Sequence, residues 1–207
     1  MFQQRSLEKF TLKGMLYFTQ GAQNGWEGTE GLEGAIGVAL SPDGEYLYVS
    51  GAASVVAFAR DAATSELHFL EAHFDGQNGI DGLDGAYGLA VAPDGKHVYV
   101  CGEYADAVAV FARNEATGRL AFVEAVQNAV LDSATDVAVA PDGSFAAYVG
   151  IPYDKTNCRG IYEPVCTHPD HQRKGLARTL MTEGLHRLRA IGAVDATSGI
   201  VSVLPGT

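Results

Sequence analysis

The sequence predicts a mixed β and α/β fold, in which two to three antiparallel four-stranded units precede a β-loop-α unit. A Pro-Asp-Gly turn occurs three times, beginning at Pro42, Pro93 and Pro141. Short apolar and β-branched segments between turn residues surround the copies, as expected for strands. Beyond about residue 150 this pattern ends. A strand, a basic loop and a segment of helical periodicity follow it.

The turns mark an internal repeat, because they recur at spacings of 51 and 48 residues. The flanking blocks agree in register: residues 56–60 match residues 109–113, and residues 16–18 match residues 67–69 and 120–122. In each turn proline sets φ and glycine tolerates a positive φ. The second unit is expected to hold four strands, at about 87–92, 96–101, 107–112 and 119–124.

Four strands in about 50 residues is the spacing of a propeller blade. Residues 12–145 resemble the repeats of the lactonase-like seven-bladed propellers. A closed propeller takes about 4 to 8 blades, and this stretch holds roughly two and a half, so we expect an incomplete ring. Self-association through unpaired blade edges is a possible consequence. The family's lactone-hydrolysing residues are spread over many blades, and none of them is assigned in this chain.

The Asp- and Gly-rich stretch at 75–82 raises the question of calcium. An EF-hand loop requires a Glu at its twelfth position, and counting from Asp75 that position is Ala86. A turn between blades is therefore the better interpretation. We expect no metal in this protein.

Charge is unevenly distributed along the chain. Residues 1–149 contain 7 basic and 20 acidic residues, a charge of −13, whereas residues 150–207 contain 7 and 5, a charge of +2. The acidic part argues against nucleic acid, and the small basic part suits one anionic ligand. No apolar run of about 18 residues is present, so no membrane span is expected. The three cysteines form no disulfide framework, which favours a cytoplasmic location.

The C-terminal part reads as a strand at 159–167, a turn at 168–171 and a helix from about 175 to 190. Leu176, Leu180 and Leu188 have near-helical spacing, and Leu185 should broaden the same apolar face. The first amides of a helix have no intrahelical acceptor and attract anions. This corner is therefore a predicted anion site.

The residues at the corner support that prediction. Gly175 allows close approach of the backbone, and the small side chain of Ala177 leaves the first turn uncrowded. Arg173, Lys174 and Arg178 add positive charge. A diphosphate group would be well held there.

The motif Gln172-x-x-Gly175-x-Ala177 resembles the Q/R-x-x-G-x-G/A signature of the GNAT acetyltransferases, and the likeness covers residues 146–193. The expected architecture is thus two to three antiparallel propeller-type blades followed by a partial GNAT-like β-loop-α unit. The predicted domains are residues 1–145 and residues 146–207.

The resemblance implies acetyl-CoA as co-substrate and an unidentified amine as acceptor. It implies that backbone groups of three strand residues bind the pantetheine arm: Val165, Cys166 and Thr167. It implies that Gln172 and the amides of the following residues hold the diphosphate: Arg173, Lys174, Gly175, Leu176, Ala177 and Arg178. Glu163 is the candidate general base for the attacking amine.

Each of these assignments has a plainer alternative. Glu163 is equally compatible with a solvent-facing or ion-paired strand residue. Cys166 suits a small apolar strand position better than a nucleophile, because direct attack needs no thiol. Cys166, His168 and His171 lack the fourth ligand of a structural zinc site, so a metal cluster is not favoured.

The chain also departs from the GNAT pattern. No tyrosine follows Tyr162 to protonate the leaving thiolate, and propeller repeats stand where the family builds its amine pocket. Two functions therefore remain open: an acyl-CoA-dependent N-acyltransferase, or a lactonase-like propeller with binding or hydrolase activity and a degenerate C-terminal fusion. A fused or truncated reading frame without activity is a third possibility.

Overall fold

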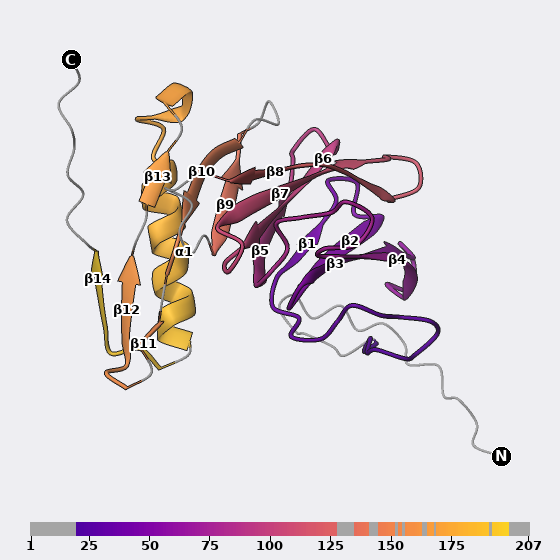
Figure 1. The fold of residues 1–207 in the computed structure, drawn as a ribbon, viewed down its shortest axis with the longest axis horizontal. Helices are drawn as coiled ribbons and strands as arrows, with labels where there is room; N and C mark the ends of the chain where they lie inside the picture. The colour runs from indigo at the N-terminus through magenta and orange to yellow at the C-terminus, as the bar shows by residue number, and fades with distance from the viewer. Residues whose placement is uncertain are drawn as a thin grey trace.

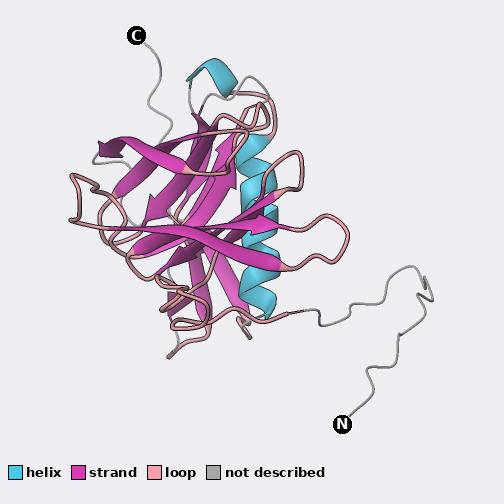
Figure 2. Cartoon of the chain, turned by 90° about the vertical axis from the view of Figure 1, so that its right-hand side faces the viewer, coloured by secondary structure: helices cyan, strands magenta, loops and turns pink. Residues whose placement is uncertain are grey.

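The computed structural model describes residues 20–127, 135–140, 145–151, 153–154, 156–162, 165–167, 169–190 and 192–198. This part of the protein is mostly antiparallel sheet, with one short 3₁₀ helix and one α-helix (Figures 1 and 2). None of its helices has the length and apolar character needed to cross a bilayer.

The two complete repeat units form the first and second sheets, each a simple four-stranded meander. The first sheet contains β1 (Val38–Leu40), β2 (Tyr46–Gly51), β3 (Ser54–Arg60) and β4 (Leu67–Phe74). The second sheet contains β5 (Ala86–Val91), β6 (His97–Gly102), β7 (Ala107–Arg113) and β8 (Leu120–Gln127). The four strands predicted for the second unit are confirmed, each within three residues of its predicted bounds.

The Pro-Asp-Gly turns connect the first two strands of each sheet for the expected reason. Gly44 and Gly95 have φ values of 73° and 76°, which glycine adopts without strain. The Gly44 N–H donates to the Ser41 carbonyl at 2.9 Å, and the Asp43 carboxylate accepts from the Glu45 N–H at 2.9 Å. The turn is therefore closed by its own backbone and its own aspartate.

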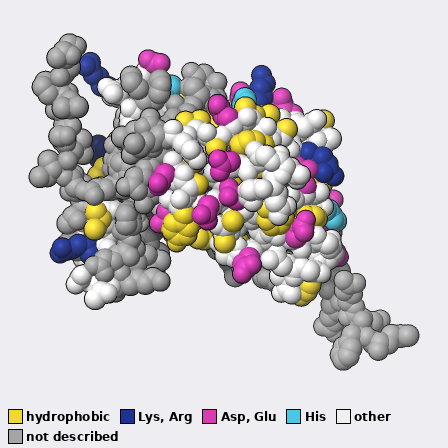
Figure 3. All heavy atoms as spheres, viewed as in Figure 1, with side chains coloured by type: hydrophobic (Ala, Val, Ile, Leu, Met, Phe, Trp, Pro, Cys, Tyr) yellow, Lys and Arg dark blue, Asp and Glu magenta, His cyan; other side chains and the backbone are white. Residues whose placement is uncertain are grey.

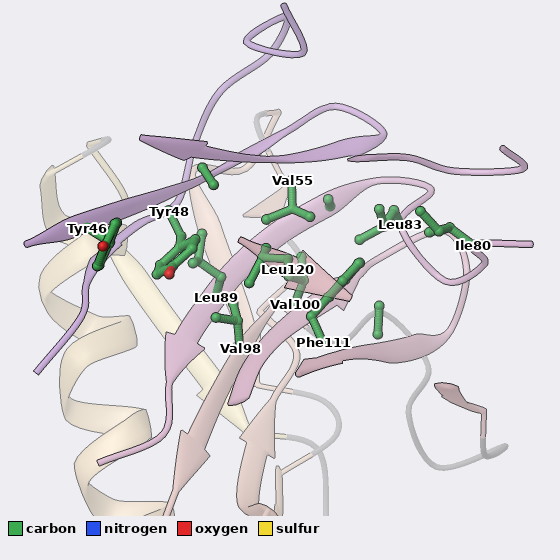
Figure 4. Close-up of a cluster of buried hydrophobic side chains, with 13 residues drawn as sticks. Tyr46, Tyr48, Val55, Ile80, Leu83, Leu89, Val98, Val100, Phe111 and Leu120 are labelled. Atoms are coloured by element: carbon green, nitrogen blue, oxygen red, sulfur yellow. The ribbon is translucent and has the colours of Figure 1, made fainter. Parts of the chain in front are cut away.

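The first and second sheets pack face to face and enclose the main core (Figure 4). Tyr48, Val55 and Ala57 come from the first sheet, and their side chains are fully buried. They meet alternate residues of the second sheet, among them Val100 and Phe111, which are also fully buried. Alternation along each strand thus places one apolar face of each unit in this core.

Arg113 fixes the second sheet to the turn of the first. Its side chain is 1% exposed and pairs with Asp43 at 2.8 Å. It also donates to the Tyr48 hydroxyl at 2.9 Å and to the Gly95 carbonyl at 2.9 Å, and it lies 5.0 Å from the Tyr46 ring centroid. One guanidinium therefore joins both sheets.

The third repeat begins but does not finish as the first two do. The third sheet has the order β13–β10–β9, made of β9 (Asp136–Val139), β10 (Phe145–Val149) and β13 (Val165–Thr167). β9 packs against β5 and β6 of the second sheet, as the next unit of a repeat should. β13 then takes the place that a third repeat strand would occupy beside β10.

A fourth sheet continues from the third. It has the order β11–β12–β14, with β11 (Tyr153–Asp154), β12 (Arg159–Tyr162) and β14 (Asp195–Ser198). Tyr153 pairs with Gly160, and Val149 pairs with Val165. Residues 145–154 and 159–167 are therefore the two arms of one hairpin, whose register shifts by one residue between β12 and β13.

Helix α1 (Leu176–Ala190) follows η1 (Pro169–His171) and packs on this hairpin (Figure 1). Leu180 and Leu188 are buried against Ala147 and Val149 of β10. A Cβ at Gly160 would lie 2.2 Å from Leu188, so glycine allows β12 to approach the helix.

Two expectations for this region were wrong. Leu185 is 49% exposed and does not extend the apolar face, because α1 packs on the sheet through a narrow line of residues. β14 was not expected, yet it pairs in parallel with β12. The short, polar segment Asp195–Ser198 carries no strong strand pattern and is a strand because β12 offers it a free edge.

Candidate functional site

The strand that precedes α1 offers free backbone at one edge. β12 is central in the fourth sheet, with β11 on one side and β14 on the other. β13 is an edge strand of the third sheet, paired only with β10 among the described residues. The backbone groups of β13 that point away from β10 are therefore available to a ligand with amide groups.

The corner between β13 and α1 is a 3₁₀ turn followed by residues of unusual backbone conformation. Arg173 and Gly175 have positive φ values, 63° and 80°. The Gly175 carbonyl accepts from the Thr179 N–H at 3.0 Å, so the helix begins at this glycine. The amides of Leu176, Ala177 and Arg178 belong to the first turn, where no intrahelical acceptor exists. This corner matches the predicted strand–loop–helix.

The corner is accessible and basic (Figure 3 gives the distribution of charged side chains on one face of the molecule). Gln172, Arg173, Lys174, Gly175 and Arg178 are exposed. A Cβ at Gly175 would meet nothing within 4 Å, which leaves the helix entrance open. Basic side chains beside free helix amides attract an anion through both their charge and the helix dipole.

His171 lies differently from its expected position in an open loop. It ends η1 and is 6% exposed. Its Nδ1 lies 3.1 Å from Lys174 Nζ, which acts as the donor because an ammonium group has no acceptor. His171 therefore fixes Lys174 from beneath the corner.

A shallow depression of about 340 Å³ runs from the corner along one side of α1. It is lined by Arg178, Thr179, Thr182 and His186. Sequence reasoning missed Thr182 and His186, although their spacing of four residues from Arg178 places all three on one helix face. The depression extends the basic surface beyond the residues of the motif.

Two proposed residues lie outside the described residues, namely Glu163 and His168. The backbone of Cys166 belongs to β13, but its side chain is not described. Among the residues that the structure describes, no group of three or more His, Cys, Asp or Glu is placed to hold a metal. The role of Glu163 stays a prediction.

The Asp- and Gly-rich stretch uses its carboxylates within the fold. Asp75 accepts from the Leu83 N–H at 2.8 Å, and Asp81 accepts from the Gly82 N–H at 2.9 Å. These bonds shape the connection from β4 to β5, which is the turn between units that we expected.

Comparison with known families identifies both parts of the chain. Residues 8–139 match the model of the lactonase family, described as a seven-bladed β-propeller. The chain belongs to the lactonase β-propeller family. Residues 115–200 match the model of the acetyltransferase (GNAT) family. The expected union of lactonase-type repeats with a GNAT segment is confirmed.

Solved structures share the fold of this lactonase-family chain. A protein from Lactobacillus plantarum is 21% identical, with a TM-score of 0.51, over 68% of this chain and 42% of its own. The periplasmic gluconolactonase of Pseudomonas aeruginosa is 23% identical, with a TM-score of 0.49, over 67% of this chain and 40% of its own. This chain thus spans about two fifths of the length of these structures. No curated protein matches it.

Proposed function

We propose that the chain is an acyl-CoA-dependent N-acyltransferase, which transfers an acetyl group from acetyl-CoA to an amine. The observation that carries the proposal is the placement of a free strand edge directly before an open helix N-terminus. β13 has one unpaired edge among the described residues, and α1 begins at an exposed, basic corner. A ligand with amide groups followed by a diphosphate fits this sequence of binding groups.

The proposed roles follow from that geometry. The free backbone groups of Val165, Cys166 and Thr167 bind the pantetheine amides in the manner of an added strand. The diphosphate lies on the amides from Arg173 to Arg178, beside Gln172. The depression at Thr182 and His186 receives the part of the coenzyme beyond the diphosphate.

Acetyl-CoA supplies a thioester whose carbonyl carbon the amine attacks. A C–N bond forms, the C–S bond breaks and the coenzyme leaves as a thiolate that takes up a proton. Glu163 is proposed to accept the proton of the amine. The amine itself and the group that protonates the thiolate are not assigned.

Binding of acetyl-CoA tests the proposal, with two glycine variants as a matched pair. Gly175 and Gly192 flank the two ends of α1, have φ values of 80° and 87°, and would each place a Cβ in open space. The backbone strain of a substitution is therefore similar at both positions. Gly175→Glu puts a carboxylate where the diphosphate is proposed, whereas Gly192→Glu puts it at the far end of the helix.

We expect calorimetry to detect acetyl-CoA binding by the unaltered chain. Gly175→Glu should weaken it at least about tenfold, since like charges repel at close range. Gly192→Glu should leave it unchanged. Equal effects of the two variants, or no binding to the unaltered chain, would rule the site out. Release of free coenzyme thiol with a panel of amines then tests transfer, and Glu163→Gln tests the base.

The second candidate function is lactone binding or hydrolysis by the repeat units, with an inactive C-terminal segment. It is favoured by the family match over residues 8–139. Lactone hydrolysis by a chain that fails to bind acetyl-CoA would select it. We propose two to three blades in residues 1–145 and a partial GNAT unit in residues 146–207, and we keep the cytoplasm as the proposed compartment.

A further inference from the structure

The first sheet has one face against the second sheet and an opposite face that no other sheet covers in the described part of the chain. We call this opposite face the open face; it comprises Val38, Leu40, Leu47, Val49 and Arg60. Because the units are repeats, every position on the open face has a counterpart on the second sheet that the first sheet does cover.

Exposure at these paired positions differs strongly. Val38 is 63% exposed, whereas its counterpart Leu89 is 9% exposed. Val49 is half-buried, whereas its counterpart Val100 is fully buried. The residue types are equivalent, so the difference comes from the neighbour that the second sheet has and the first lacks. Apolar side chains spaced this way are typical of a covered interface.

Two hollows lie on the same side of the first sheet. One of about 790 Å³ is lined by residues that include Phe58, Leu67 and Phe69. The other, of about 290 Å³, is lined by residues that include Leu47 and Val49. On the second sheet the corresponding space is filled by side chains of the first.

Arg60 is the counterpart of Arg113 and is oriented in the same way. Its Nη1 donates to the Gly44 carbonyl at 3.1 Å, as Arg113 Nη1 donates to Gly95 at 2.9 Å. Arg113 then reaches Asp43 in the turn of the preceding unit. Among the described residues, Arg60 has no carboxylate within ion-pair distance, and its Nη2 donates instead to Ser65 Oγ at 2.8 Å.

Gln20 gives a second link to a missing unit. In the repeat register it is the counterpart of Glu71, whose carboxylate accepts from the Leu120 N–H at 2.6 Å. Gln20 makes the same contact one unit earlier, since its carboxamide oxygen accepts from the Leu67 N–H at 2.7 Å. The outermost position of a preceding unit is therefore already filled by this chain.

We infer that the open face docks a further antiparallel sheet of the same repeat type, carried by a partner polypeptide, whose Pro-Asp-Gly turn places a carboxylate on Arg60. The charge of Arg60 and the apolar surface around it match that partner as the second sheet matches the first. A carboxylate displaces the Ser65 hydroxyl because a charge-assisted hydrogen bond is the stronger one. The inference does not rest on the proposed acyl transfer.

Ser65 restricts which partner fits. Its counterpart is Gly118, against which Tyr46 packs so closely that a Cβ would lie 2.0 Å from the ring. The partner must therefore carry a residue smaller than tyrosine at the position equivalent to Tyr46. This requirement separates docking in the repeat register from loose apolar contact.

A fusion tests the surface in the intact fold. Residues 1–15 are replaced by a second copy of residues 35–66, so that the repeat runs unbroken into Leu16. The copy carries Tyr46→Ala, and the fusion supplies the partner sheet at high effective concentration. The chain carries Val38→Cys, and its alkylation rate is measured by peptide mass spectrometry. Val123→Cys, on β8 at a position 52% exposed, is the control.

We expect the fusion to slow alkylation at position 38 about sevenfold, the ratio of 63% to 9% exposure, because thiol reactivity follows access. The rate at position 123 should not change. Arg60→Gln in the chain or Asp43→Asn in the copy should abolish the slowing. A copy that keeps Tyr46 should protect position 38 only when Ser65→Gly is added.

An unchanged rate at position 38 in every fusion overturns the inference. Slower alkylation that ignores both Arg60→Gln and Asp43→Asn overturns it as well, because the sheet would then cover the face without the proposed register.

Discussion

Replacing Arg113 by methionine should separate the first and second sheets more than any other single change of charge. Methionine keeps much of the apolar stem and removes only the guanidinium. The variant leaves the buried Gly95 carbonyl without its donor, at a cost of about 1–3 kcal/mol. The Asp43 carboxylate is 38% exposed, so water replaces Arg113 there and the lost pair adds only about 0–1 kcal/mol.

The Tyr48 hydroxyl is the remaining partner. It still donates to the Gly118 carbonyl at 2.9 Å in the variant, so it is not left unsatisfied. Together with the lost contact to the Tyr46 ring, worth about 0.5–2 kcal/mol, we expect Arg113→Met to lower the free energy of unfolding by about 2–4 kcal/mol. Urea unfolding followed by circular dichroism measures this difference.

Arg60→Met is the matched control for this prediction. Arg60 occupies the same repeat position but is only half-buried and has no carboxylate partner among the described residues. Its replacement should cost less than about 1 kcal/mol, as for most changes at such sites. If Arg60→Met costs as much as Arg113→Met, the loss comes from the arginine stem, and the guanidinium of Arg113 does not hold the two sheets together.

Acid should weaken the same interface. Partial burial alone would raise the pKa of Asp43, but hydrogen bonds from Ser41, the Glu45 N–H and Arg113 lower it to about 2. A carboxyl whose pKa is depressed on folding stabilises the folded state above its unfolded pKa, near 3.8. The stability difference between the protein and Asp43→Asn should therefore be constant above about pH 5. It should shrink between about pH 4 and pH 2; a constant difference across that window contradicts the assignment.

Three further changes report on other parts of the fold. Gly118→Ala should cost about 2–4 kcal/mol, because it forces an aromatic ring away at a φ of 68°, whereas Gly76→Ala at a φ of 69° in open space should cost about 1 kcal/mol; urea unfolding compares them. Burial raises the pKa of the Cys101 thiol, so it should resist alkylation until the second and third sheets separate, and rapid labelling of the native protein would refute this. Partial burial raises the pKa of Glu71, but bonds from the Leu120 N–H, His73 and Arg119 outweigh it; Glu71→Gln should therefore destabilise the protein at pH 7 and less below pH 4, in unfolding measured at both pH values.

The repeat units could be predicted from sequence because local and long-range signals agree in them. The turn residues and the alternation of apolar residues both place β5 to β8 near their observed bounds. The contacts between units could not be predicted, because Arg113 and Asp43 are 70 residues apart and neither stands in a recognisable motif. Repetition itself held the missing signal: an arginine at the end of the third strand follows an aspartate in the turn of each unit.

The candidate site was predictable for a different reason. A helix N-terminus after a glycine and among basic residues depends on local sequence alone, and α1 begins within one residue of its expected start. The free edge of β13 could not be read in the same way. It depends on β10 and β14, which pair with different halves of residues 159–167. Pairing between distant segments also explains why β14 and the exposure of Leu185 were missed.

The join between the two families is physically simple because both need the same kind of strand at one place. As the second strand of a repeat unit, β10 must pair antiparallel with β9; as the first arm of a hairpin, it must pair antiparallel with β13. The two partners use opposite edges, so the backbone of β10 can satisfy both. Its buried Ala147 and Val149 meet α1 where a repeat would meet its next sheet. Helix α1 thus covers an apolar face that would otherwise be open, and loss of this cover should expose the third sheet before the first two.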